Sequence, residues 1–287
     1  MIEVLKSGFY STIQDLGRFG SENYGVPISG SMDQFSSIIS NKLLGNKDND
    51  AVMEITMTGP VLKFLEKTKI SITGADISPS INNNPVKLNI VHNINKGDFL
   101  SFGKLKYGIR SYLSVSGGFL TKEVMGSKSM YPNITKSVRI ADGEYLKIKA
   151  LNKINIDPEI TQIDYLKHFK TNKIKVFKGP EFDELSDKQK HNIFNKNFTI
   201  SNDNNRMAFQ LNETFINKLK PIITSLVMQG TVQLTPSGKL IILMRDNQTC
   251  GGYPRVLQLN ESAINKLSQK HMNNEIKFEL IDAFEIS

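Results

Sequence analysis

The stretch VQLTPSGKLIIL, residues 232–243, contains two apolar runs separated by Pro236, Ser237 and Gly238. The alternation of apolar and polar residues before the proline is typical of a half-buried strand. Proline and glycine favour tight turns, and two strand-like runs around such a turn are typical of a β-hairpin. The stretch therefore predicts two antiparallel strands that begin and end within residues 231–244.

Similar short runs, rich in β-branched and aromatic residues, recur along the rest of the chain. Several end at turn-forming residues, such as the Asn-Pro pair at 84–85 and the Asp-Gly pair at 142–143. Many short strands at a spacing of roughly ten residues favour a barrel or a sandwich over a doubly wound sheet. We expect further strands at 61–65, 69–73, 86–91, 110–116, 145–150 and 173–177.

Helical spacing is confined to a few short segments that carry capping residues. Asp33 is the expected N-cap of the first helix, and Gly45 is its expected stop. Ser186 with Gln189 three residues later has the pattern of a capping box, and Asn260 is the expected cap of a third helix. The chain is therefore predicted to be mainly β with a few short helices.

A polar stretch at residues 151–172 joins two strand-rich halves. Exposed polar linkers usually mark domain boundaries. We therefore expect an N-terminal β-barrel-like domain at 1–160 and a C-terminal β-barrel-like domain at 161–287.

The composition limits the classes of function. The 287 residues carry a net charge of +8, but the lysines are scattered, which favours a composition bias over nucleic-acid binding. No apolar run is long enough to span a membrane, and the N-terminus does not resemble a signal peptide. We expect a cytoplasmic protein that binds neither nucleic acid nor membrane.

Histidine and cysteine give no readable metal or nucleophile site. The four histidines have no metal-ligand spacing, so no metal is expected, and the default is a surface or structural role. The single cysteine, Cys250, cannot form an intrachain disulfide. No P-loop, dinucleotide-binding glycine motif or nucleophile elbow is present.

The first candidate segment is IQDLGRFGSENYGVPISGSMD, residues 13–33. It combines four glycines with Gln14, Asp15, Arg18 and Asp33. Such a segment suits a ligand-binding loop, because glycines allow unusual backbone angles and close approach. An equally good interpretation is a structural loop in which Asp15 and Arg18 pair with each other.

Other candidate side chains lie where strands begin or end. Asp76 follows a strand and Gly74, whereas Arg110 precedes a strand that ends in a glycine pair. Arginine offers a planar fork that matches a carboxylate or a phosphate, although each residue also suits an ordinary surface position. Glu54 lies in an apolar run, where a solvated position in an alternating strand is the favoured interpretation. Arg206, flanked by amides, is a further candidate.

The stretch MRDNQTCGGYPRV, residues 244–256, follows the second strand of the predicted hairpin. It contains an unusual variety of polar groups, and its glycine pair would expose backbone N–H groups to an anion. We interpret it as one wall of a small-molecule pocket. The residues concerned are Asp246, Gln248, Gly251, Gly252, Tyr253 and Arg255.

Eight motifs in order, from about residue 2 to residue 280, resemble the allophanate hydrolase subunit 2 family, which includes the C-type subunit of 5-oxoprolinase and is biotin-dependent carboxyltransferase-like. They are IQDLGRFG…GVPISGSMD, MEITMTGP, TGAD, RSYLSVSGG, MGSKS, KVFKGPE, NNRMAFQL and DNQTCGGYPR. The chain departs from the family pattern at Met130, Ala208 and Cys250. Relatives have threonine where this chain has Cys250, which favours a packing role for the cysteine.

The resemblance implies tandem cyclophilin-like β-barrel domains. It also implies a subunit of an ATP-dependent 5-oxoprolinase complex, inactive alone, that opens pyroglutamate to glutamate. Its partners would be a B-type sister subunit of related fold and a third, lactam-opening subunit, and any of these could bind ATP. One alternative is a carboxyltransferase subunit of a biotin-dependent, urea amidolyase-type system. Another is a Kip-type regulator that binds a sister protein without catalysis.

Under the 5-oxoprolinase interpretation the candidate residues receive roles. The catalytic candidates are Asp15, Arg18, Asp246 and Arg255. The substrate-binding candidates are Gln14, Asp33, Asp76, Arg110, Arg206, Gln229, Gln248, Gly251, Gly252 and Tyr253. Arginines and backbone N–H groups would bind anionic oxygens, and the glutamines would read an amide in both directions.

Overall fold

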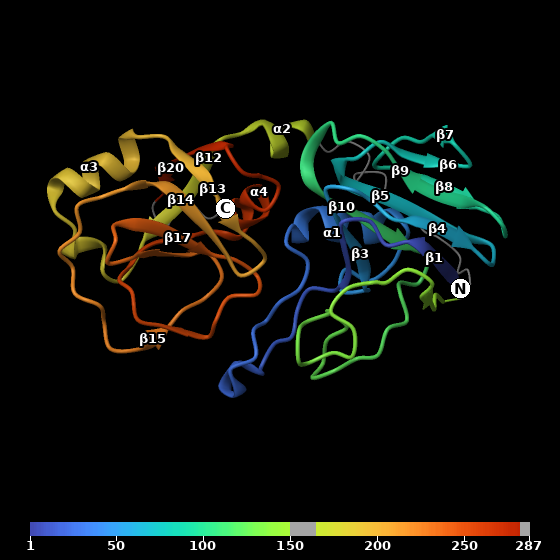
Figure 1. Ribbon diagram of the computed structural model, residues 1–287, viewed down its shortest axis with the longest axis horizontal. Helices are drawn as coiled ribbons and strands as arrows, with labels where there is room; N and C mark the ends of the chain where they lie inside the picture. Colours follow the sequence, from blue (N-terminus) through green and yellow to red (C-terminus); the bar gives the residue numbers. More distant parts are fainter. Residues whose placement is uncertain (150–164, 282–287) are drawn as a thin grey trace. The chain divides into compact units, whose positions relative to one another are not determined.

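The computed structural model describes residues 1–149 and 165–281. The chain divides into two compact units (Figure 1). The expected boundary between residues 160 and 161 lies outside the described residues.

The two units do not follow the chain in simple order. The first unit contains Met1–Phe19 and Ser29–Phe169, and the second contains Gly20–Ile28 together with the chain from Lys170 onward. The middle of the glycine-rich segment therefore belongs to the second unit. Its two flanks, which carry Asp15 and Asp33, belong to the first.

The first unit contains two sheets. The six-stranded sheet has the order β11-β1-β4-β9-β6-β7, and the five-stranded sheet has the order β2-β3-β10-β5-β8. The strands of the larger sheet are β1 (Ile2–Lys6), β4 (Val61–Phe64), β6 (Pro79–Ile81), β7 (Asn84–Pro85), β9 (Phe99–Phe102) and β11 (Tyr145–Leu146). Those of the smaller sheet are β2 (Tyr10–Gln14), β3 (Val52–Thr56), β5 (Thr68–Asp76), β8 (Val91–Ile94) and β10 (Tyr107–Val115).

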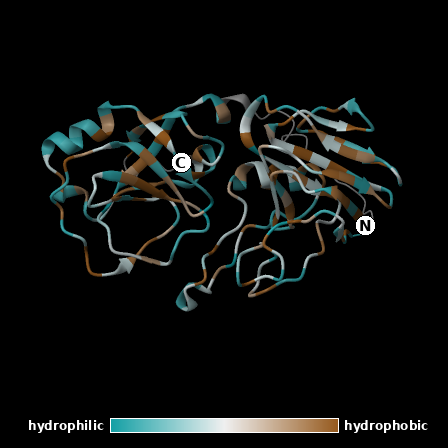
Figure 2. Cartoon of the chain, viewed as in Figure 1, coloured by the Kyte–Doolittle hydropathy of each residue, from teal (hydrophilic) through white to brown (hydrophobic). Residues whose placement is uncertain are grey.

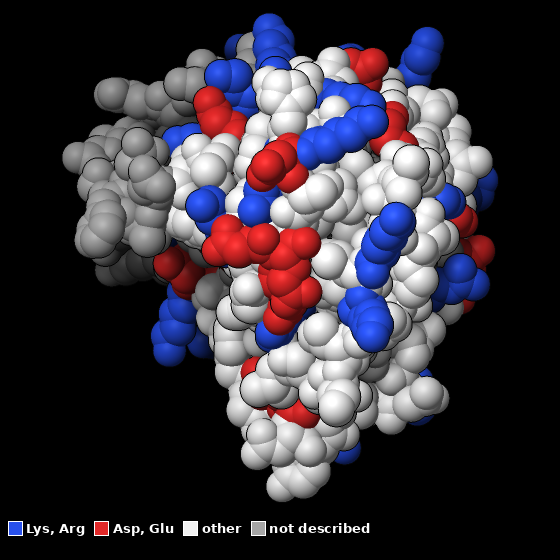
Figure 3. Space-filling model, turned by 90° about the vertical axis from the view of Figure 1, so that its left-hand side faces the viewer, with Lys and Arg blue, Asp and Glu red and all other residues white. Residues whose placement is uncertain are grey.

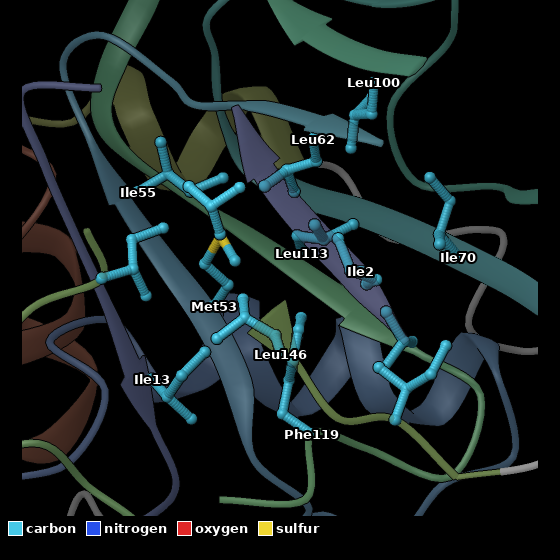
Figure 4. Close-up of a cluster of buried hydrophobic side chains, with 14 of the residues drawn as sticks. Ile2, Ile13, Met53, Ile55, Leu62, Ile70, Leu100, Leu113, Phe119 and Leu146 are labelled. Carbon is cyan, nitrogen blue, oxygen red and sulfur yellow. The ribbon is translucent and has the colours of Figure 1, made fainter. Parts of the chain in front are cut away.

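One hydrophobic core joins these two sheets (Figure 4). Ile2 and Leu62 enter it from the six-stranded sheet, and Met53, Ile55 and Leu113 enter it from the five-stranded sheet. All five side chains are fully buried. Each buried side chain of this size stabilises the fold by about 1.5–3 kcal/mol, so this core holds the two sheets together.

A helix packs against the five-stranded sheet. Helix α1 (Gln34–Leu43) contacts β5 and β10. Asp33 caps it as predicted, since its carboxylate accepts a hydrogen bond from the Ser36 N–H at 3.1 Å. The helix ends at Leu44, and Gly45 follows with a positive φ of 61°, in agreement with the expected stop. A short helix, α2 (Tyr165–Lys170), begins where the described chain resumes.

The second unit is a closed barrel with the strand order β12-β19-β16-β17-β14-β13-β20. Its strands are β12 (Lys173–Lys178), β13 (Phe198–Asn204), β14 (Ala208–Thr214), β16 (Thr231–Leu234), β17 (Lys239–Leu243), β19 (Arg255–Leu259) and β20 (Glu275–Leu280). A separate two-stranded sheet pairs β15 (Ser225–Leu226) with β18 (Cys250–Gly251). The expectation of a mainly β, barrel-forming fold is confirmed.

Short helices accompany the barrel. They are η1 (Glu22–Tyr24), η3 (Phe182–Glu184), α3 (Asp187–Asn195) and α4 (Glu261–Leu267). The predicted capping box of Ser186 and Gln189 is present at α3, and Asn260 caps α4. Helix α3 is mostly hydrophilic in Figure 2, and Ile193 is its buried residue.

The predicted hairpin is confirmed as β16 and β17, in which Val232 pairs with Ile242 and Leu234 with Leu240. One predicted strand, at residues 86–91, is wrong, because β8 begins only at Val91. The preceding residues form an irregular segment, in which Asn89 has a φ of 61° and donates its N–H to the carbonyl of Ile72. Val86 and Leu88 of that segment are partly buried and pack against the core, whereas Ile90 is 42% exposed.

The predicted strand at 145–150 is shorter than expected. Regular pairing is confined to β11, and Ile148 forms only an isolated bridge to Phe119. No described helix is long and apolar enough to cross a membrane. The face in Figure 3 carries acidic side chains near its middle with basic side chains around them, so charges of both signs share it.

The hairpin turn generates a stability prediction. Gly238 has a φ of 83°, and a Cβ there would lie 1.9 Å from the carbonyl oxygen of Phe215. Gly25, in the same unit, has a φ of 73° with open space around it. Both alanine variants carry about 1–2 kcal/mol of left-handed strain, but only Gly238→Ala adds a clash of about 1–3 kcal/mol. Urea unfolding should show the larger loss of unfolding free energy for Gly238→Ala, and equal losses would contradict the turn geometry.

Candidate functional site

Asp15 is buried and ties down a distant loop. One carboxylate oxygen accepts hydrogen bonds from the Gly17 N–H at 2.9 Å, from Ser127 Oγ at 2.7 Å and from Ser129 Oγ at 2.6 Å. The other accepts the Lys128 N–H at 2.6 Å. Four donors replace the water that the carboxylate loses on burial. Asp15 therefore holds the loop at residues 127–129 in place.

Arg18 and Gln14 bind the same part of the chain. Arg18 is fully buried and donates from Nε to the Val124 carbonyl at 3.0 Å and from Nη2 to the Ser129 carbonyl at 2.9 Å. Gln14 donates from Nε2 to the Met130 carbonyl at 3.3 Å. Three predicted site residues thus meet at one loop, residues 124–130, which contains the MGSKS motif.

A second buried cluster surrounds the start of helix α1. The Oδ2 atom of Asp33 accepts a hydrogen bond from Ser36 Oγ at 2.6 Å and lies 3.0 Å from Nε2 of His168 in α2. The Asp33 N–H donates to the Tyr112 hydroxyl at 2.7 Å. That hydroxyl donates in turn to Oε2 of Glu54 at 2.9 Å. A histidine, two carboxylates and a phenol therefore form one connected network.

Burial keeps the Tyr112 phenol of this network protonated. Loss of solvent raises the pKa of Tyr112 well above its ordinary value, and the nearby Glu54 and Asp33 carboxylates raise it further. The phenol therefore stays protonated, and its O–H group donates a hydrogen bond to Glu54. Arg110 lies 4.0 Å from Glu54 across the same strands, so this predicted residue joins the cluster together with Asp33. Asp33, Glu54 and Tyr112 are at most 1% exposed.

Sequence reasoning missed three members of this cluster. Glu54 is 1% exposed, so its interpretation as a solvated strand position is wrong. Every residue of β3 except the last is buried, which removes the alternation on which that interpretation depended. Tyr112 and His168 carried no local signal, because their partners lie 58 and 135 residues away in the sequence. A charged residue within an apolar strand was the one available sign.

Asp76 lies apart from both clusters within the first unit. It ends β5, accepts the Ser78 N–H at 2.8 Å and forms an ion pair with Lys106 at 3.2 Å. The contacts are those of a turn residue near the surface.

Two predicted arginines of the second unit form bidentate ion pairs. Arg206 donates from Nε and Nη2 to the two oxygens of Asp246 at 2.8 and 3.0 Å. Arg255 donates in the same way to Glu181, at 3.0 and 2.7 Å, and from Nη1 to the Leu226 carbonyl at 3.0 Å. A new anion would have to compete with a carboxylate at each fork. The structure thus brings Arg206 and Asp246 together and attaches Arg255 to a different partner.

Gly251 is the last residue of β18, and Gly252 follows it. A Cβ on Gly251 would lie 2.6 Å from Nε2 of Gln233, so the Gln233 amide would have to shift to admit a side chain there. The Gly252 carbonyl accepts the Ile222 N–H at 2.9 Å. Tyr253 is 39% exposed. Oε1 of Gln248 is buried and accepts no hydrogen bond within the described part of the chain.

A cavity of about 290 Å³ opens in the second unit, next to this stretch. We call it the loop pocket. It is lined by Glu22, Pro27 and Ile28 of the glycine-rich segment, by Leu226, Val227, Met228 and Gln229, and by Asn247 and Thr249. The glycine-rich segment and the stretch after β17 therefore meet, although through residues 22–28 and not through Asp15 or Arg18. The volume is near the lower end for small-molecule sites.

One wall of the loop pocket is held by Arg245, which is 1% exposed. Arg245 donates to Oε1 of Gln229 at 2.6 Å and to Oδ1 of Asn265 at 2.9 Å, and it pairs with Glu261 of α4. Nε2 of Gln229 donates back to the Arg245 carbonyl at 3.2 Å. These contacts fix the orientation of the Gln229 amide.

Three other polar groups of the loop pocket remain available to a ligand. The carboxylate of Glu22 and the side-chain oxygen Oδ1 of Asn247 have no hydrogen-bond partner within residues 1–149 and 165–281. The Thr249 hydroxyl has only a 4.0 Å contact with the sulfur of Cys250. Acceptors and a hydroxyl thus converge on a mostly apolar cavity, which is an arrangement suited to a small amide. Among the described residues, no three potential metal ligands cluster.

The family model named carboxyltransferase domain, subdomain A and B, matches residues 24–280. The chain belongs to this family. The match confirms the resemblance seen in the motifs.

Relatives of this carboxyltransferase-family chain carry two kinds of name. It is 28% identical to the C-type subunit of 5-oxoprolinase from Haemophilus influenzae, over 98% of this chain and 91% of that protein. It is 39% identical to urea amidolyase of Lachancea kluyveri, but over 45% of this chain and 7% of that protein. The solved urea amidolyase of K. lactis has a TM-score of 0.86 and 26% identity, over 98% of this chain and 19% of that one. The chain thus spans a small part of the urea amidolyases that it matches.

These relatives support the expected 5-oxoprolinase and carboxyltransferase names, and they give no support to the Kip-type regulator. The fold of the K. lactis protein agrees with the mainly β architecture of this chain. The roles of individual residues stay predictions.

The ion pair of Arg255 generates a pH prediction. Hydrogen bonding from Arg255 is the largest cause that holds the pKa of Glu181 below its ordinary value of 4.5. A depressed carboxylate pKa stabilises the fold fully above that ordinary value, and the contribution is lost as the pH falls through the lower folded value. Glu181→Gln should therefore lose less unfolding free energy than the wild type between about pH 6 and about pH 3.

Chemical denaturation at a series of pH values measures this difference. Glu184→Gln is the matched control, because the Glu184 carboxylate is exposed and accepts no hydrogen bond within the described chain. The control should follow the wild type. Parallel pH profiles for Glu181→Gln and the wild type would contradict the assignment.

Proposed function

We propose that this chain is the C-type subunit of an ATP-dependent 5-oxoprolinase complex, which opens pyroglutamate to glutamate. The extent of the match to the Haemophilus 5-oxoprolinase subunit carries the proposal, because it covers 98% of this chain and 91% of the relative. The match to the Lachancea urea amidolyase covers only 7% of that protein. A subunit of the first kind accounts for nearly the whole of both chains.

The loop pocket supplies chemistry that suits a lactam. A lactam presents one N–H donor and one carbonyl acceptor. In the proposed complex, the Glu22 carboxylate accepts the ring N–H, and the Thr249 hydroxyl donates to the ring carbonyl. Asn247 and the fixed amide of Gln229 hold the ring edge, and apolar residues exclude water from it. Such positioning raises the rate because the reacting groups are held before the reaction begins.

Opening a lactam breaks its C–N bond, and the unactivated carbonyl carbon is a poor electrophile. Transfer of the γ-phosphoryl group of ATP to the lactam oxygen, with release of ADP, would activate this carbon, so that water attacks it and the ring nitrogen leaves as the amine. The loop pocket has no cationic lining residue, so we assign to it the amide of the substrate and not the phosphates. The complex is therefore expected to bind ATP outside the loop pocket.

The proposed partners are a B-type sister subunit of related fold and a third, lactam-opening subunit. Exposed apolar side chains beside the loop pocket support a partner contact, since Leu226 is 75% exposed and Met228 is 58% exposed. Adjacent apolar side chains that are both exposed and close to a cavity suit burial by another protein. We expect the isolated chain to be inactive.

The family match favours a second candidate function. A carboxyltransferase domain in a urea amidolyase-type system would transfer a carboxyl group from carboxybiotin to urea. Urea also presents N–H donors and a carbonyl oxygen, so the loop pocket would accept it through the same groups. Biotin would be required only for this alternative.

Reconstitution tests the proposal. The chain is coexpressed with its sister and lactam-opening subunits, and ATP-dependent glutamate release from pyroglutamate is measured. Glu22→Gln with Asn247→Ala should lower the rate about tenfold or more, because a charge-assisted hydrogen bond and an amide contact are lost. Asp203→Asn is the control, since this exposed carboxylate lies in the same unit and accepts no hydrogen bond within the described chain.

Two results would count against the proposal. An unchanged rate in the Glu22 and Asn247 variant, with the complex still assembled, would remove the loop pocket from the site. Carboxyl transfer from carboxybiotin to urea, without glutamate release by the wild-type complex, would establish the second candidate instead.

A further inference from the structure

A second cavity, of about 490 Å³, lies in the first unit beside the MGSKS loop. We call it the lysine pocket. It is lined in part by Lys122, Lys128, Lys136 and Lys147, with Glu144 as its one carboxylate among the lining residues. Four ammonium groups against one carboxylate give the walls a net of three positive charges. None of the catalytic or binding roles proposed for the loop pocket involves this cavity.

In the described part of the chain, the four lysines have no counter-ion. Within residues 1–149 and 165–281, none of their ammonium groups forms an ion pair or a hydrogen bond. The Glu144 carboxylate accepts the Ala141 N–H at 3.1 Å instead of pairing with a lysine. Like charges around a concave surface raise the local potential and concentrate anions there.

Buried hydrogen bonds hold one wall of the lysine pocket in place. Lys128 and Val124 lie on the loop that Asp15 and Arg18 hold through buried hydrogen bonds. Ser129 is bound from both sides, because its hydroxyl donates to Asp15 and its carbonyl accepts from Arg18. Asp15 and Arg18, two of the four residues that the sequence suggested as catalytic, therefore hold this wall in place.

Thr121 adds a polar group that lacks a protein partner. Its Oγ1 atom is buried at the edge of the lysine pocket and makes no hydrogen bond within the described part of the chain. Buried hydroxyls are rarely left without a partner, because the loss of water is then uncompensated. A ligand oxygen that enters the pocket would accept this hydrogen bond.

We propose that the lysine pocket binds a compact, multiply charged anion of the phosphate class. A polyphosphate carries enough negative charge to balance a net of three, and a single phosphate carries about two charges, whereas a monocarboxylate carries one. Lysine binds phosphate as a point charge, and a concavity of this volume is the size of a small-molecule site. The proposal is independent of the proposed function, because the lysine pocket and the loop pocket lie in different units.

Calorimetric titration of the full chain with sodium tripolyphosphate, in a buffer without phosphate, tests this site. The wild type should bind, with an affinity that falls as the salt concentration rises. Lys128→Gln with Lys147→Gln should weaken binding at least about tenfold, since two of the cations are removed. Lys128→Arg with Lys147→Arg keeps the charges and should bind within about threefold of the wild type.

Lys67→Gln with Lys96→Gln is the matched control. Lys67 and Lys96 are exposed in the same unit and do not line the pocket. Their substitution removes two positive charges, as the pocket variant does. This variant should bind like the wild type. Circular dichroism and thermal unfolding confirm that each variant is folded, so that lost binding reports on the site.

Titrations with ATP, tripolyphosphate and pyroglutamate identify which part of a ligand the site binds. Equal affinities for ATP and tripolyphosphate would support a site that reads phosphate groups alone, and tighter binding of ATP would add contacts to the nucleoside. No binding of any phosphate probe at millimolar concentration would overturn the proposal. Equal weakening by the pocket variant and the control variant, or binding of pyroglutamate as tight as that of tripolyphosphate, would also overturn it.

Discussion

A charged side chain can be buried only where protein groups replace the water that it loses, and this constraint organises both units. Asp15 meets it with four hydrogen-bond donors from two segments of the chain. Arg245 meets it with an amide, a carboxylate and a second amide. Each solution joins parts of the sequence that are far apart, so each buried charge also fixes a loop.

The loops that are fixed in this way line the two cavities. Asp15 and Arg18 hold the loop that carries Lys128 into the lysine pocket. Arg245 holds Gln229, which lines the loop pocket. A binding site needs side chains that keep their geometry before the ligand arrives, because ordering them at binding would weaken affinity. The hydrogen bonds of the buried charges thus fix the positions of cavity residues before a ligand binds.

Local features of this fold were predictable, and tertiary ones were not. The hairpin turn at Gly238 and the caps at Asp33 and Asn260 depend on neighbours within a few residues, so the sequence pattern specified them. Glu54 was misassigned because strand β3 is buried on both faces: Met53 and Ile55 enter the core between the sheets, and Glu54 on the other face accepts hydrogen bonds from the Met32 N–H and the Tyr112 hydroxyl. Similarly, Val86 and Leu88 of the apolar run at 86–91 pack against the core outside any strand, and no local pattern separates this outcome from strand formation.

The candidate site shows the same division. Arginine, carboxylate and glycine in one segment suggested a ligand site, but the partners of Asp15 lie more than a hundred residues away. Glu22 lay in the right segment without any feature that separated it from its neighbours. A pocket wall was expected at residues 244–256, and that expectation stays a prediction. The loop pocket is lined from this stretch by Asn247 and Thr249, and by part of residues 22–28, which the contact pattern places in the second unit.

Arginine and lysine differ in a way that accounts for the difference between the predicted anion-binding residues, which are arginines, and those of the proposed anion site, which are lysines. Arginine has a planar fork that fits a carboxylate bidentately, and Arg206 and Arg255 are occupied in this way by Asp246 and Glu181. Lysine has a flexible stem and a strongly hydrated head, so it can remain at the wall of a cavity without a fixed partner. Sequence reasoning weighted arginine because of its geometry. That same geometry lets Arg206 and Arg255 pair bidentately with carboxylates of the fold, whereas the four lysines of the lysine pocket have no such partner among the described residues.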